Sequence, residues 1–586
     1  MKEREENLME NYQNSVNKPL FTWKRYNPDA IARYYNQRPW LVIGRIIQVI
    51  WCFLGFIINI LWDKLFNQEE QNKLKRATQI REILTNLGPT YIKVGQALST
   101  RPDLIRKDFL EELIKLQDQL PPFPQSIAFD IIETELDKHI TDIFKEISPN
   151  PVAAASLGQV YRAKLYTGEE VAVKVQRPNL LPVLTLDLYL MRGMASSFGQ
   201  FLPLNLGHNL TLIVDEFGTK LFEEVDYMNE GRNAEKFATN FRDDPTVKVP
   251  SIYWDYSSKH VLTLEWINGC KLTDTEQIKK SGYTSENIVK IGVTSGLKQL
   301  LEHGFFHADP HPGNLFALPD GRMGYIDFGM MEQLEEETKE TLVSSVVHLI
   351  NQDYHELAQD FVKLGFLTAD TDITPIIPAL EAVFKDAIGA KVGDFNFKTI
   401  TDKFSDLMYQ YPFRVPAKFA LIIRSLVTQE GLALSINPDF KIVAIAYPYV
   451  SQRLLTGESP ELRRRLLEVL FKNGEFQWQR LENMIGIARS DGNFDLLPTA
   501  QLGLQYLLSD EGKFLRQQIL QALIADDRLH TKEVERLWNL VKEDMPPQRI
   551  FNVAWSAFTE FSSEKVAAFL PSVPQLALLN TDNNVK

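Results

Sequence analysis

The sequence of 586 residues predicts an α+β fold with two lobes, a small β-rich lobe followed by a larger helical lobe. Short apolar runs bounded by turn residues occur from residue 151, as expected for strands. Helical periodicity returns at 285–303 and dominates from residue 332 onward. The chain is too long for one hydrophobic core, so further segments are expected at both ends. The predicted divisions are 1–69 (lead-in with an apolar helix), 70–150 (helical extension), 151–268 (small lobe), 269–400 (large lobe) and 401–586 (C-terminal helical region).

The lead-in contains an uncharged apolar run at residues 46–62, after forty mostly polar residues. A helix of this length is about 25 Å long, near the lower limit for crossing a hydrocarbon layer of about 30 Å. Trp40, Trp51 and Trp62 recur every eleven residues, which places them on one side of a helix. Three interpretations stay open: a membrane span, an interfacial anchor, or a helix buried against the rest of the protein. No small-residue cleavage site follows the run, so no cleavable signal peptide is predicted.

The extension is predicted to be helical from residue 70 to about 138, with breaks at Gly88-Pro89 and at Pro121–Pro124. One of its helices starts just after Pro89, because proline is favoured in a first helical turn. This helix carries Lys93 and Gln96.

The small lobe is predicted to contain a hairpin with strands at 160–165 and 170–175. Alternation along the second strand places three valines on one face and Lys174 on the other. A lysine flanked by buried apolar residues needs an anionic partner, because burial of a bare ammonium is prohibitive. An exposed lysine on an edge strand is the alternative.

The loop before this hairpin stands where a glycine-rich phosphate loop would be, but it is rich in alanine. Each Cβ restricts φ and keeps the backbone farther from a phosphate. Backbone amides and the Ser156 hydroxyl can still donate to phosphate oxygens, whereas a plain tight turn is the alternative. The loop positions predicted to contact nucleotide are Ala153, Ala154, Ala155, Ser156 and Gly158.

An acidic cluster occupies residues 222–230, which are predicted to form part of one helix. Glu223, Asp226 and Glu230 share a helix face by their spacing, while Glu224 projects elsewhere. A solvated helix surface is the alternative to a functional role for these carboxylates.

Two motifs in the large lobe carry most of the chemical information. Asp309 and Asn314 belong to an H-x-D-x-x-x-x-N loop, and Asp327 begins a D-F-G triplet. Kinase-like enzymes hold metal-bound nucleotide phosphates with this pair of motifs. Apolar runs flanking a Pro-Asp-Gly turn predict a hairpin between the motifs. That hairpin would bring Asn314 and Asp327 to one end, where their oxygens can share Mg²⁺.

Composition limits the other classes of function. The chain is 44% hydrophobic and 24% charged, which is typical of a folded protein and argues against extensive disorder. Its formal charge of −13 argues against nucleic acid as the main partner. The dense basic cluster at Arg463–Arg465 fits a solvated helix face. Two cysteines, Cys52 and Cys270, provide no disulfide framework or cysteine metal site.

Taken together, these residues resemble the UbiB/AarF/ADCK family of atypical protein-kinase-like proteins over roughly residues 70–400. The resemblance rests on a K-x-G-Q signature, an alanine-rich loop, a V-A-V-K lysine, an E-x-D pair and the two large-lobe motifs. The signature residues are Lys93, Gly95, Gln96, Ser99 and Arg101-Pro102-Asp103; the E-x-D pair is Glu224 and Asp226.

The resemblance implies a site for ATP or ADP with Mg²⁺. Lys174 would contact the α- and β-phosphates and pair with a helix glutamate, Glu230 as first choice and Glu224 as second. Asn314 and Asp327 would bind the metal ion, and Asp309 would be the catalytic base. The extension would fold over this site, so that its motif residues enter the cleft near the E-x-D pair. The residues expected there are Lys93, Gln96, Glu224 and Asp226, and Glu265, from a strand predicted at 261–266, is also expected to contact the nucleotide.

The family resemblance further implies an ATPase or small-molecule kinase that supports isoprenoid quinone or prenyl-lipid metabolism at membranes. The expected partners are a nucleotide, membrane lipid or a prenylated phenol or quinone, and a complex of biosynthetic enzymes. The expected location is a cytoplasmic or organellar, thylakoid-type membrane surface, without secretion. A protein kinase acting in trans and a nucleotide-sensing scaffold are the alternatives. Ala308 replaces the arginine of H-R-D, so activation by loop phosphorylation is not expected.

Overall fold

The computed structural model describes residues 25–99, 107–116, 122–198, 210–272, 285–311, 313–350, 352–388, 415–437, 442–456, 470–472 and 475–489, with isolated positions between and beyond these ranges. Two compact units are present: Met1–Lys339 with Phe361–Ile442, and Glu340–Asp360 with Val443–Lys586. The predicted features at Arg101-Pro102-Asp103 and Arg463–Arg465, and most of the predicted C-terminal region 401–586, lie outside the described residues.

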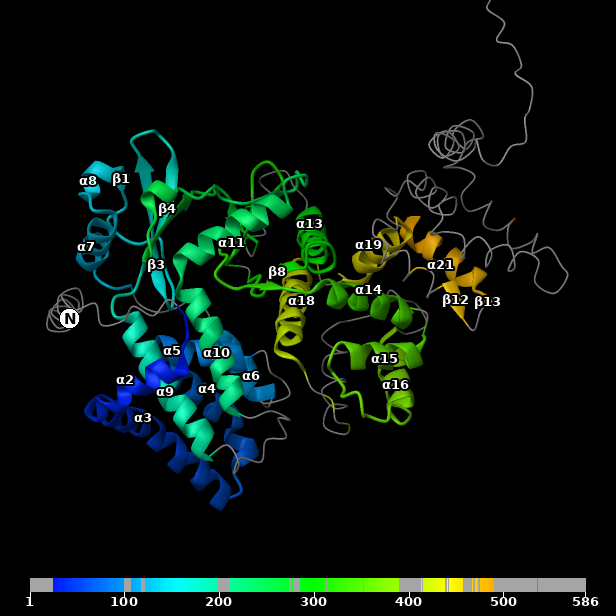
Figure 1. Cartoon of the computed structure of the whole chain (residues 1–586), viewed down its shortest axis with the longest axis horizontal. Helices are drawn as coiled ribbons and strands as arrows, with labels where there is room; N and C mark the ends of the chain where they lie inside the picture. The colour runs from blue at the N-terminus through cyan, green and yellow to red at the C-terminus, as the bar shows by residue number, and fades with distance from the viewer. Residues whose placement is uncertain are drawn as a thin grey trace, which may run out of the picture. The chain divides into compact units, whose positions relative to one another are not determined.

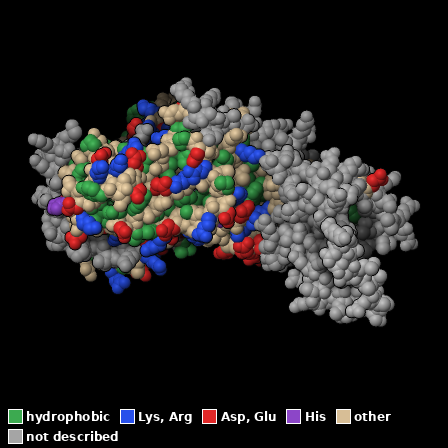
Figure 2. Space-filling view, turned by 90° about the horizontal axis from the view of Figure 1, so that it is seen from above, with side chains coloured by type: hydrophobic (Ala, Val, Ile, Leu, Met, Phe, Trp, Pro, Cys, Tyr) green, Lys and Arg blue, Asp and Glu red, His purple; other side chains and the backbone are tan. Residues whose placement is uncertain are grey.

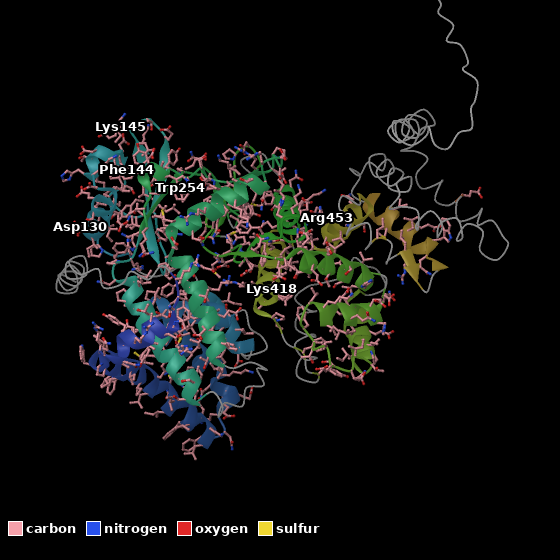
Figure 3. All side chains as sticks on the ribbon, in the orientation of Figure 1. Asp130, Phe144, Lys145, Trp254, Lys418 and Arg453 are labelled. Atoms are coloured by element: carbon pink, nitrogen blue, oxygen red, sulfur yellow. The ribbon has the colours of Figure 1, made fainter. Side chains whose placement is uncertain are left out.

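The small lobe of the first unit is built on an antiparallel sheet (Figure 1). Its strands follow the order β1-β3-β4-β6, and β2 pairs with β3. The sheet begins at Phe144, before the predicted start of the lobe at residue 151; Figure 3 shows Phe144 and Lys145 on this first strand. Gly168, with φ of 107°, supplies the left-handed residue in the turn between β3 and β4. The strands are β1 (Phe144–Ile147), β2 (Ala153–Ala154), β3 (Gly158–Leu165), β4 (Glu170–Gln176) and β6 (Val261–Glu265).

Alternation along β4 decides which element covers each face of this sheet. Val171, Val173 and Val175 are fully buried in a core shared with helix α7 (Gln125–Leu136). Ala172 belongs instead to a cluster with Tyr227, at the start of helix α11 (Tyr227–Asn240). The odd positions of β4 therefore build the core, and the even positions face α11, where Lys174 follows.

A set of helices precedes the small lobe in the sequence. Pro89 at the start of α5 and Gly88, with φ of 104°, separate α4 from α5 as predicted. Apolar residues of α4, α5 and α6 pack in one core, which α3 joins from one side. The helices are α2 (Pro28–Asn36), α3 (Pro39–Leu65), α4 (Glu69–Leu87), α5 (Pro89–Leu98), α6 (Lys107–Leu113), η1 (Ile114–Leu116) and α8 (Ile140–Ile143).

Helix α3 exposes most of its apolar residues. None of its most apolar eighteen-residue window is buried, so the interpretation as a helix buried against the rest of the protein is wrong. Trp40, Trp51 and Trp62 are 65%, 76% and 58% exposed. Val49, Cys52 and Phe53 lie on the opposite side and pack against the core of α4 and α5. The helix is thus amphipathic in its packing although nearly uncharged in sequence.

Two helices precede α11, and the junction corrects one prediction. Helix α10 (Leu210–Val225) ends before Asp226, and α11 starts after it, so the acidic cluster does not lie on one helix. Asp226 accepts hydrogen bonds from the amides of Met228 and Asn229, as an N-cap residue does. The capping tendency of aspartate outweighed the helical spacing of the acidic residues. Helix α9 (Leu180–Phe198) packs beside α10 (Figure 1).

The larger lobe combines helices with short strands. Strand β10 pairs with β9 in the predicted hairpin and with β5 on its other side. Rings of Phe237, Tyr325 and Phe328 join α11 to this lobe, with Phe237 at 5.0 and 5.4 Å from the other two ring centroids. The elements are β5 (Val247–Lys248), η3 (Trp254–Tyr256), β7 (Cys270–Lys271), α13 (Ser285–Lys298), η4 (Gln299–His303), β8 (Phe305–His307), β9 (Leu315–Ala317), β10 (Met323–Tyr325), β11 (Met331–Gln333), α16 (Ile376–Ile388) and α18 (Ala417–Ile436).

Helices α14 (Glu336–Ile350) and α15 (Tyr354–Lys363) run from one unit into the other. Within the second unit, His348 Nδ1 lies 2.8 Å from Asp360 Oδ2. The prediction of helices alone from residue 401 is wrong in one place, because a short hairpin interrupts them. The further elements are α19 (Val443–Thr456), β12 (Phe471–Lys472), β13 (Glu475–Phe476) and α21 (Trp478–Arg489).

The described surface is mixed in charge. Figure 2 shows acidic and basic side chains intermingled on the face that it presents, with hydrophobic side chains between them. No field of one sign covers the described part of this face.

Candidate functional site

Lys174 is the centre of a charged cluster between β4 and α11. Its Nζ donates to both carboxylate oxygens of Glu230, each at 2.8 Å. The same nitrogen lies 3.8 Å from Asp327 Oδ2 and 5.1 Å from the centroid of the Tyr227 ring. We refer to Lys174, Tyr227, Glu230 and Asp327 as the Lys174 cluster. The structure thus joins Lys174 to the first of the two glutamates predicted as its partner.

Local structure explains why these groups meet. The pleat of β4 turns Lys174 toward α11, and the Asp226 cap starts α11 four residues before Glu230. The amide of Asn233, one turn further, donates to the Phe328 carbonyl at 3.0 Å. This bond ties α11 to the D-F-G triplet, so the helix brings Glu230 and Asp327 to the same lysine.

Burial and charge act against each other in the cluster. Burial raises the pKa of Glu230 to about 7, although the Lys174 ammonium opposes the shift. Burial would also raise the pKa of Asp327, but Lys174 and the Gly329 amide outweigh it and lower the pKa to about 2. Burial alone would lower the pKa of Lys174, and Asp327 and Glu230 reverse the shift, so its pKa is raised. Lys174 and Asp327 are therefore both charged at neutral pH.

The D-F-G hairpin holds the two predicted metal ligands together. Antiparallel pairing of Tyr325 with Leu315 is extended by a hydrogen bond from the Ile326 amide to the Asn314 carbonyl, at 3.2 Å. Asn314 and Asp327 consequently leave the same end of the hairpin. The Asn314 side-chain nitrogen donates weakly to the Asp309 carbonyl at 3.4 Å, which leaves its amide oxygen for another partner.

These residues fit a magnesium ion that is shared with a nucleotide. Among the described residues no group of three His, Cys, Asp or Glu side chains could hold a metal ion alone. Mg²⁺ in phosphate-transfer sites takes one or two protein ligands and completes its shell with phosphates and water. One anionic carboxylate on Asp327 and one amide oxygen on Asn314 match that need.

Asp309, the predicted catalytic base, is held by a residue that the sequence did not suggest. Its Oδ2 lies 2.8 Å from Nη2 of Arg424, on helix α18. Its Oδ1 is buried and has no hydrogen-bond partner among the described residues. The Asp309 amide donates to His307 Nδ1 at 3.1 Å, and burial lowers the pKa of His307. A neutral histidine and a single arginine therefore set the position of this carboxylate.

The extension reaches the same region through Lys93. Lys93, on α5, forms an ion pair with Glu224, near the end of α10. A Cβ on Gly329 would lie 3.3 Å from Asp327 Oδ1 and 3.5 Å from Glu224 Cγ, so the ion pair lies next to the D-F-G glycine. Gln96, by contrast, donates its side-chain amide to the Leu116 carbonyl at 3.2 Å, within the extension.

Close packing explains the glycine between these motif residues. A Cβ on Gly95 would come 2.2 Å from Leu116 and 3.0 Å from Leu84. Only a residue without a side chain lets α5 approach its neighbours so closely. The K-x-G-Q spacing is therefore partly a packing requirement.

The alanine-rich loop forms a narrow β-hairpin. Ala153 and Ala154 pair with Val160 and Gln159, and the Ala155 amide donates to the Gly158 carbonyl at 2.8 Å. Ser156 at its turn is 5% exposed. The neighbouring Leu157 is buried among apolar residues of α2, α9 and α10.

Gly158 lies directly beside the Lys174 cluster. A Cβ there would come 2.2 Å from the Tyr227 hydroxyl and 2.5 Å from the Val175 carbonyl. The loop is thus placed over the cluster by contacts that exclude a side chain.

Two predicted residues have other partners. Glu265 forms an ion pair of 2.7 Å with Lys248 and accepts from the Ser251 amide, so its carboxylate is bound outside the Lys174 cluster. Asp226 caps α11. Its contribution is to start the helix that carries Glu230.

Comparison with known proteins gives the family. Residues 115–361 match the ABC1 atypical kinase-like domain, and residues 380–441 match the UbiB helical domain. A chloroplastic protein of Arabidopsis thaliana, ACTIVITY OF BC1 COMPLEX KINASE 1, is 45% identical over 89% of this chain and 79% of its own length. The chain belongs to the ABC1 and UbiB family of atypical kinase-like proteins. This finding confirms the resemblance and the predicted two-lobed α+β kinase-like fold.

Two further proteins are similar to this chain. An uncharacterized protein of Synechocystis sp. is 69% identical over 94% of this chain and 97% of its own length. A Mycobacterium tuberculosis protein solved in complex with erythromycin is 27% identical and covers 66% of this chain and 97% of its own, with a TM-score of 0.44. Arg424, the partner of Asp309, falls within the match to the UbiB helical domain.

Three residues of the candidate site were not predicted from the sequence. Tyr227 and Asn233 follow Asp226 on α11 at positions that face the cluster, so a correct helix start would have indicated them. Arg424 had no comparable signal. It contacts Asp309 across more than a hundred residues of sequence, outside any motif.

Proposed function

We propose that this family member binds magnesium ATP at the Lys174 cluster and acts as an ATPase or as a kinase of a small molecule. The observation that carries the proposal is the double hydrogen bond from Lys174 to Glu230, with Asp327 at 3.8 Å. Kinase folds place a lysine–glutamate pair and a metal-binding aspartate in this way to hold ATP phosphates.

Each residue would have a defined task. Lys174 would bind the α- and β-phosphates, oriented by Glu230. Asn314 and Asp327 would hold Mg²⁺, which neutralises phosphate charge when bound. Asp309 would accept the proton of the attacking hydroxyl or water. Most of the rate enhancement would come from positioning and charge, as is general for phosphoryl transfer.

The extension favours a small acceptor over a protein. Lys93 and Glu224 pair beside the D-F-G glycine, where a peptide substrate would need space. A protein kinase acting in trans would have to displace the partly buried Lys93 side chain and its ion pair. A small molecule or water would not.

Helix α3 supports work at a membrane surface. Arg45 forms a doubly hydrogen-bonded ion pair with the fully buried Asp187, at 2.8 and 2.9 Å. Asp63, eighteen residues on, pairs with Arg76 of α4 at 2.6 Å. The two pairs bind α3 to the protein along about 27 Å of helix. A transmembrane orientation would draw the charged helix α4 into hydrocarbon, so we propose that α3 lies in the interface with its tryptophan side in the lipid.

Family membership and the membrane surface together suggest the acceptor class. An isoprenoid quinone precursor or another prenyl lipid dissolves where α3 would place the protein. The chloroplastic relatives fit an organellar or photosynthetic membrane. Assembly with biosynthetic enzymes remains part of this proposal.

Calorimetry with ATP, with and without Mg²⁺, tests the nucleotide site. We expect magnesium-dependent binding that Asp327→Asn weakens and Lys174→Met abolishes. Phosphate release is then compared with transfer to a bystander peptide. Absence of any heat with ATP or ADP would overturn the proposal, and efficient peptide phosphorylation would favour a protein kinase.

Vesicles test the orientation of α3. Gln37→Cys and Gln68→Cys are introduced separately at its two ends in a chain whose native cysteines are replaced by serine. When the protein is added to preformed anionic vesicles, both positions should react with an impermeant maleimide. Protection of one position would show a membrane span.

A further inference from the structure

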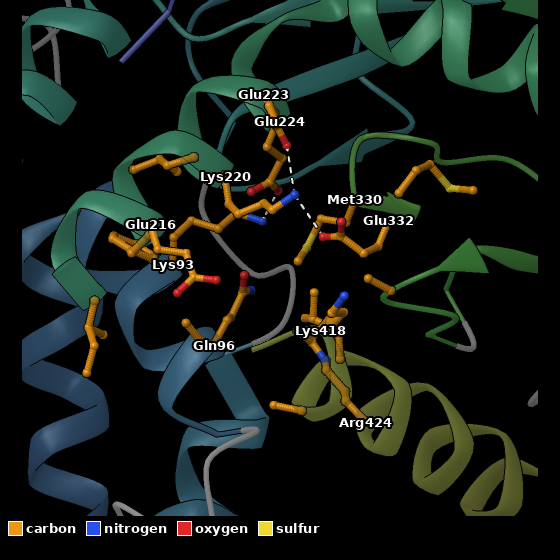
Figure 4. A pocket seen from close by; sticks show the side chains of 18 of the residues that line it. Lys93, Gln96, Glu216, Lys220, Glu223, Glu224, Met330, Glu332, Lys418 and Arg424 are labelled. Atoms are coloured by element: carbon orange, nitrogen blue, oxygen red, sulfur yellow. Dashed lines mark hydrogen bonds and ion pairs between the residues drawn. The ribbon is translucent and has the colours of Figure 1, made fainter. Parts of the chain in front are cut away.

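A large cavity is lined by both residues of the Lys93–Glu224 ion pair. Its volume is 680 Å³, within the range of about 300–1,000 Å³ that is usual for small-molecule sites. Helices α5, α10 and α18 and strand β11 form its walls (Figure 4). Ala308 and Gly329, which flank the predicted base and close the D-F-G triplet, also line it. The cavity therefore adjoins the reaction centre.

One part of the cavity wall is apolar and another is charged. The apolar part includes Ile213 and Phe217 of α10 and Leu421 of α18. Lys418 and Arg424 extend from α18 into the cavity (Figure 4). The ion pair of Lys418 with the largely exposed Glu335 measures 4.0 Å, so this lysine is weakly held. Carboxylates also line the cavity, namely Glu216, Glu223, Glu224 and Glu332. The last three pair with Lys220 or Lys93, so an anionic end fits beside Lys418 and Arg424, with the apolar body along the apolar part of the wall.

Arg424 connects the cavity to the predicted base. The guanidinium lines the cavity and also lies 2.8 Å from Asp309 Oδ2. Its side chain is 8% exposed, and Asp309 is its ion-pair partner among the described residues. While this pair is closed, the guanidinium occupies Oδ2 of Asp309, and the buried Oδ1 is the oxygen left to take the proton of a substrate hydroxyl.

We propose that this cavity binds a single-chain amphiphile with a carboxylate or phenolate head, which competes with Asp309 for Arg424. The apolar chain lies along α10 and Leu421, and the head lies between Lys418 and Arg424. Binding moves Arg424 from Asp309 and frees the carboxylate. The binding site is independent of the proposed function, whereas the effect on turnover rests on it.

Binding measured without nucleotide tests the site. Octanoate is the anionic probe, and 1-octanol has the same chain without the charge. We expect octanoate to bind at least about tenfold more tightly, because hydrogen bonds to a charged group are stronger than those to a neutral hydroxyl. Arg424→Gln should remove this difference. Equal affinity for the two probes in the unaltered protein would overturn the proposed head-group site.

Cavity-filling variants separate this site from nonspecific adsorption. Leu421→Trp fills the cavity and should abolish binding of both probes. Leu426→Trp lies on the same helix, is also half-buried and does not line the cavity, so it should bind them normally. Thermal unfolding shows whether each variant is folded. Equal binding by a folded Leu421→Trp would contradict the assignment.

Competition between the ligand and Asp309 has a consequence for affinity. Removing the carboxylate in Asp309→Asn should strengthen octanoate binding severalfold, because Arg424 no longer has to leave a partner. An arginine that only positions Asp309 predicts unchanged affinity, which would overturn the competition. This measurement needs no ATP turnover.

ATP hydrolysis provides the last test. Octanoate should stimulate phosphate release from magnesium ATP in the unaltered chain and have no effect in the Leu421→Trp variant. Binding without stimulation would overturn the release of Asp309 but leave the site. Failure of ATP to bind at all would instead overturn the proposed function, so the two failures are distinguishable.

Discussion

The two lysines near the D-F-G triplet are held in different ways. Lys174 contacts both oxygens of Glu230, lies 3.8 Å from Asp327 and packs over the Tyr227 ring. Lys93 has one ion pair in the described structure, with Glu224. The first lysine is fixed by one strand and one helix of the kinase-like core, whereas the second depends on contact between two helices of distant sequence. The core lysine is therefore held by several groups at once, whereas the Lys93 side chain is held at the site by one ion pair.

The largest effect is expected at the core lysine. Lys174→Met should lower kcat/KM for ATP by about 10²–10³-fold, because a prearranged charge on the phosphates is lost. Lys145→Met, on the exposed side of β1, is the matched control and should retain full activity (Figure 3). Steady-state phosphate release measures both variants. A loss below tenfold at Lys174 would remove the distinction between the two lysines.

The next effect concerns pH and Glu230. Its native pKa of about 7 exceeds the ordinary value of 4.5, so the native state binds more protons between these values. Folding stability should therefore fall as pH rises from 4.5 to about 7, by on the order of 3 kcal/mol. Glu230→Gln should remove this component. Urea unfolding at several pH values measures it, and an unchanged slope in the variant would contradict the assignment.

The extension pair should show a smaller coupling. Lys93→Met and Glu224→Gln should each lower the free energy of unfolding. The double variant should lower it by about 1 kcal/mol less than the sum of the two single changes. Breaking the pair leaves a partly buried charge, which explains the cost of each single change. Thermal unfolding of all four chains gives the coupling. Strict additivity would show that the two side chains act independently.

The smallest effect is expected in the alanine-rich loop. Ala154→Gly should change the Kd for ATP by no more than about tenfold, or about 1.4 kcal/mol, through closer approach of the backbone to phosphate. Ala153→Gly, which is exposed at the start of β2, is the comparison. Calorimetry with ATP and ADP provides the test. Unchanged affinity for both nucleotides would assign Ala154 to the hairpin alone.

Local sequence patterns predicted the core half of the site well. Period-two alternation placed Lys174 opposite the buried valines, and the turn residues at 319–322 predicted the hairpin that joins Asn314 to Asp327. These relations extend over a few residues, so strand geometry is sufficient to derive them.

Other features depended on competition or on distance. The spacing of the acidic residues indicated one continuous helix through Asp226, whereas aspartate also favours the N-cap position. Asp226 is the N-cap of α11 in the structure. Gln96 donates to the Leu116 carbonyl and Glu265 pairs with Lys248, and no local pattern indicated either partner. Arg424 reaches Asp309 only because the fold brings α18 next to the H-x-D-x-x-x-x-N loop. No local pattern carries that information.

The turn of the alanine-rich hairpin is anchored by an apolar side chain. Leu157 lies at this turn and is 6% exposed, in a core with Ile31 of α2 and Leu221 of α10. Lifting the hairpin would bring this side chain into water at a cost of about 1.5–3 kcal/mol, unless α2 moves with it. Because α2 leads directly into α3, an upward movement of this hairpin would also shift the helix that we propose to lie at the lipid surface.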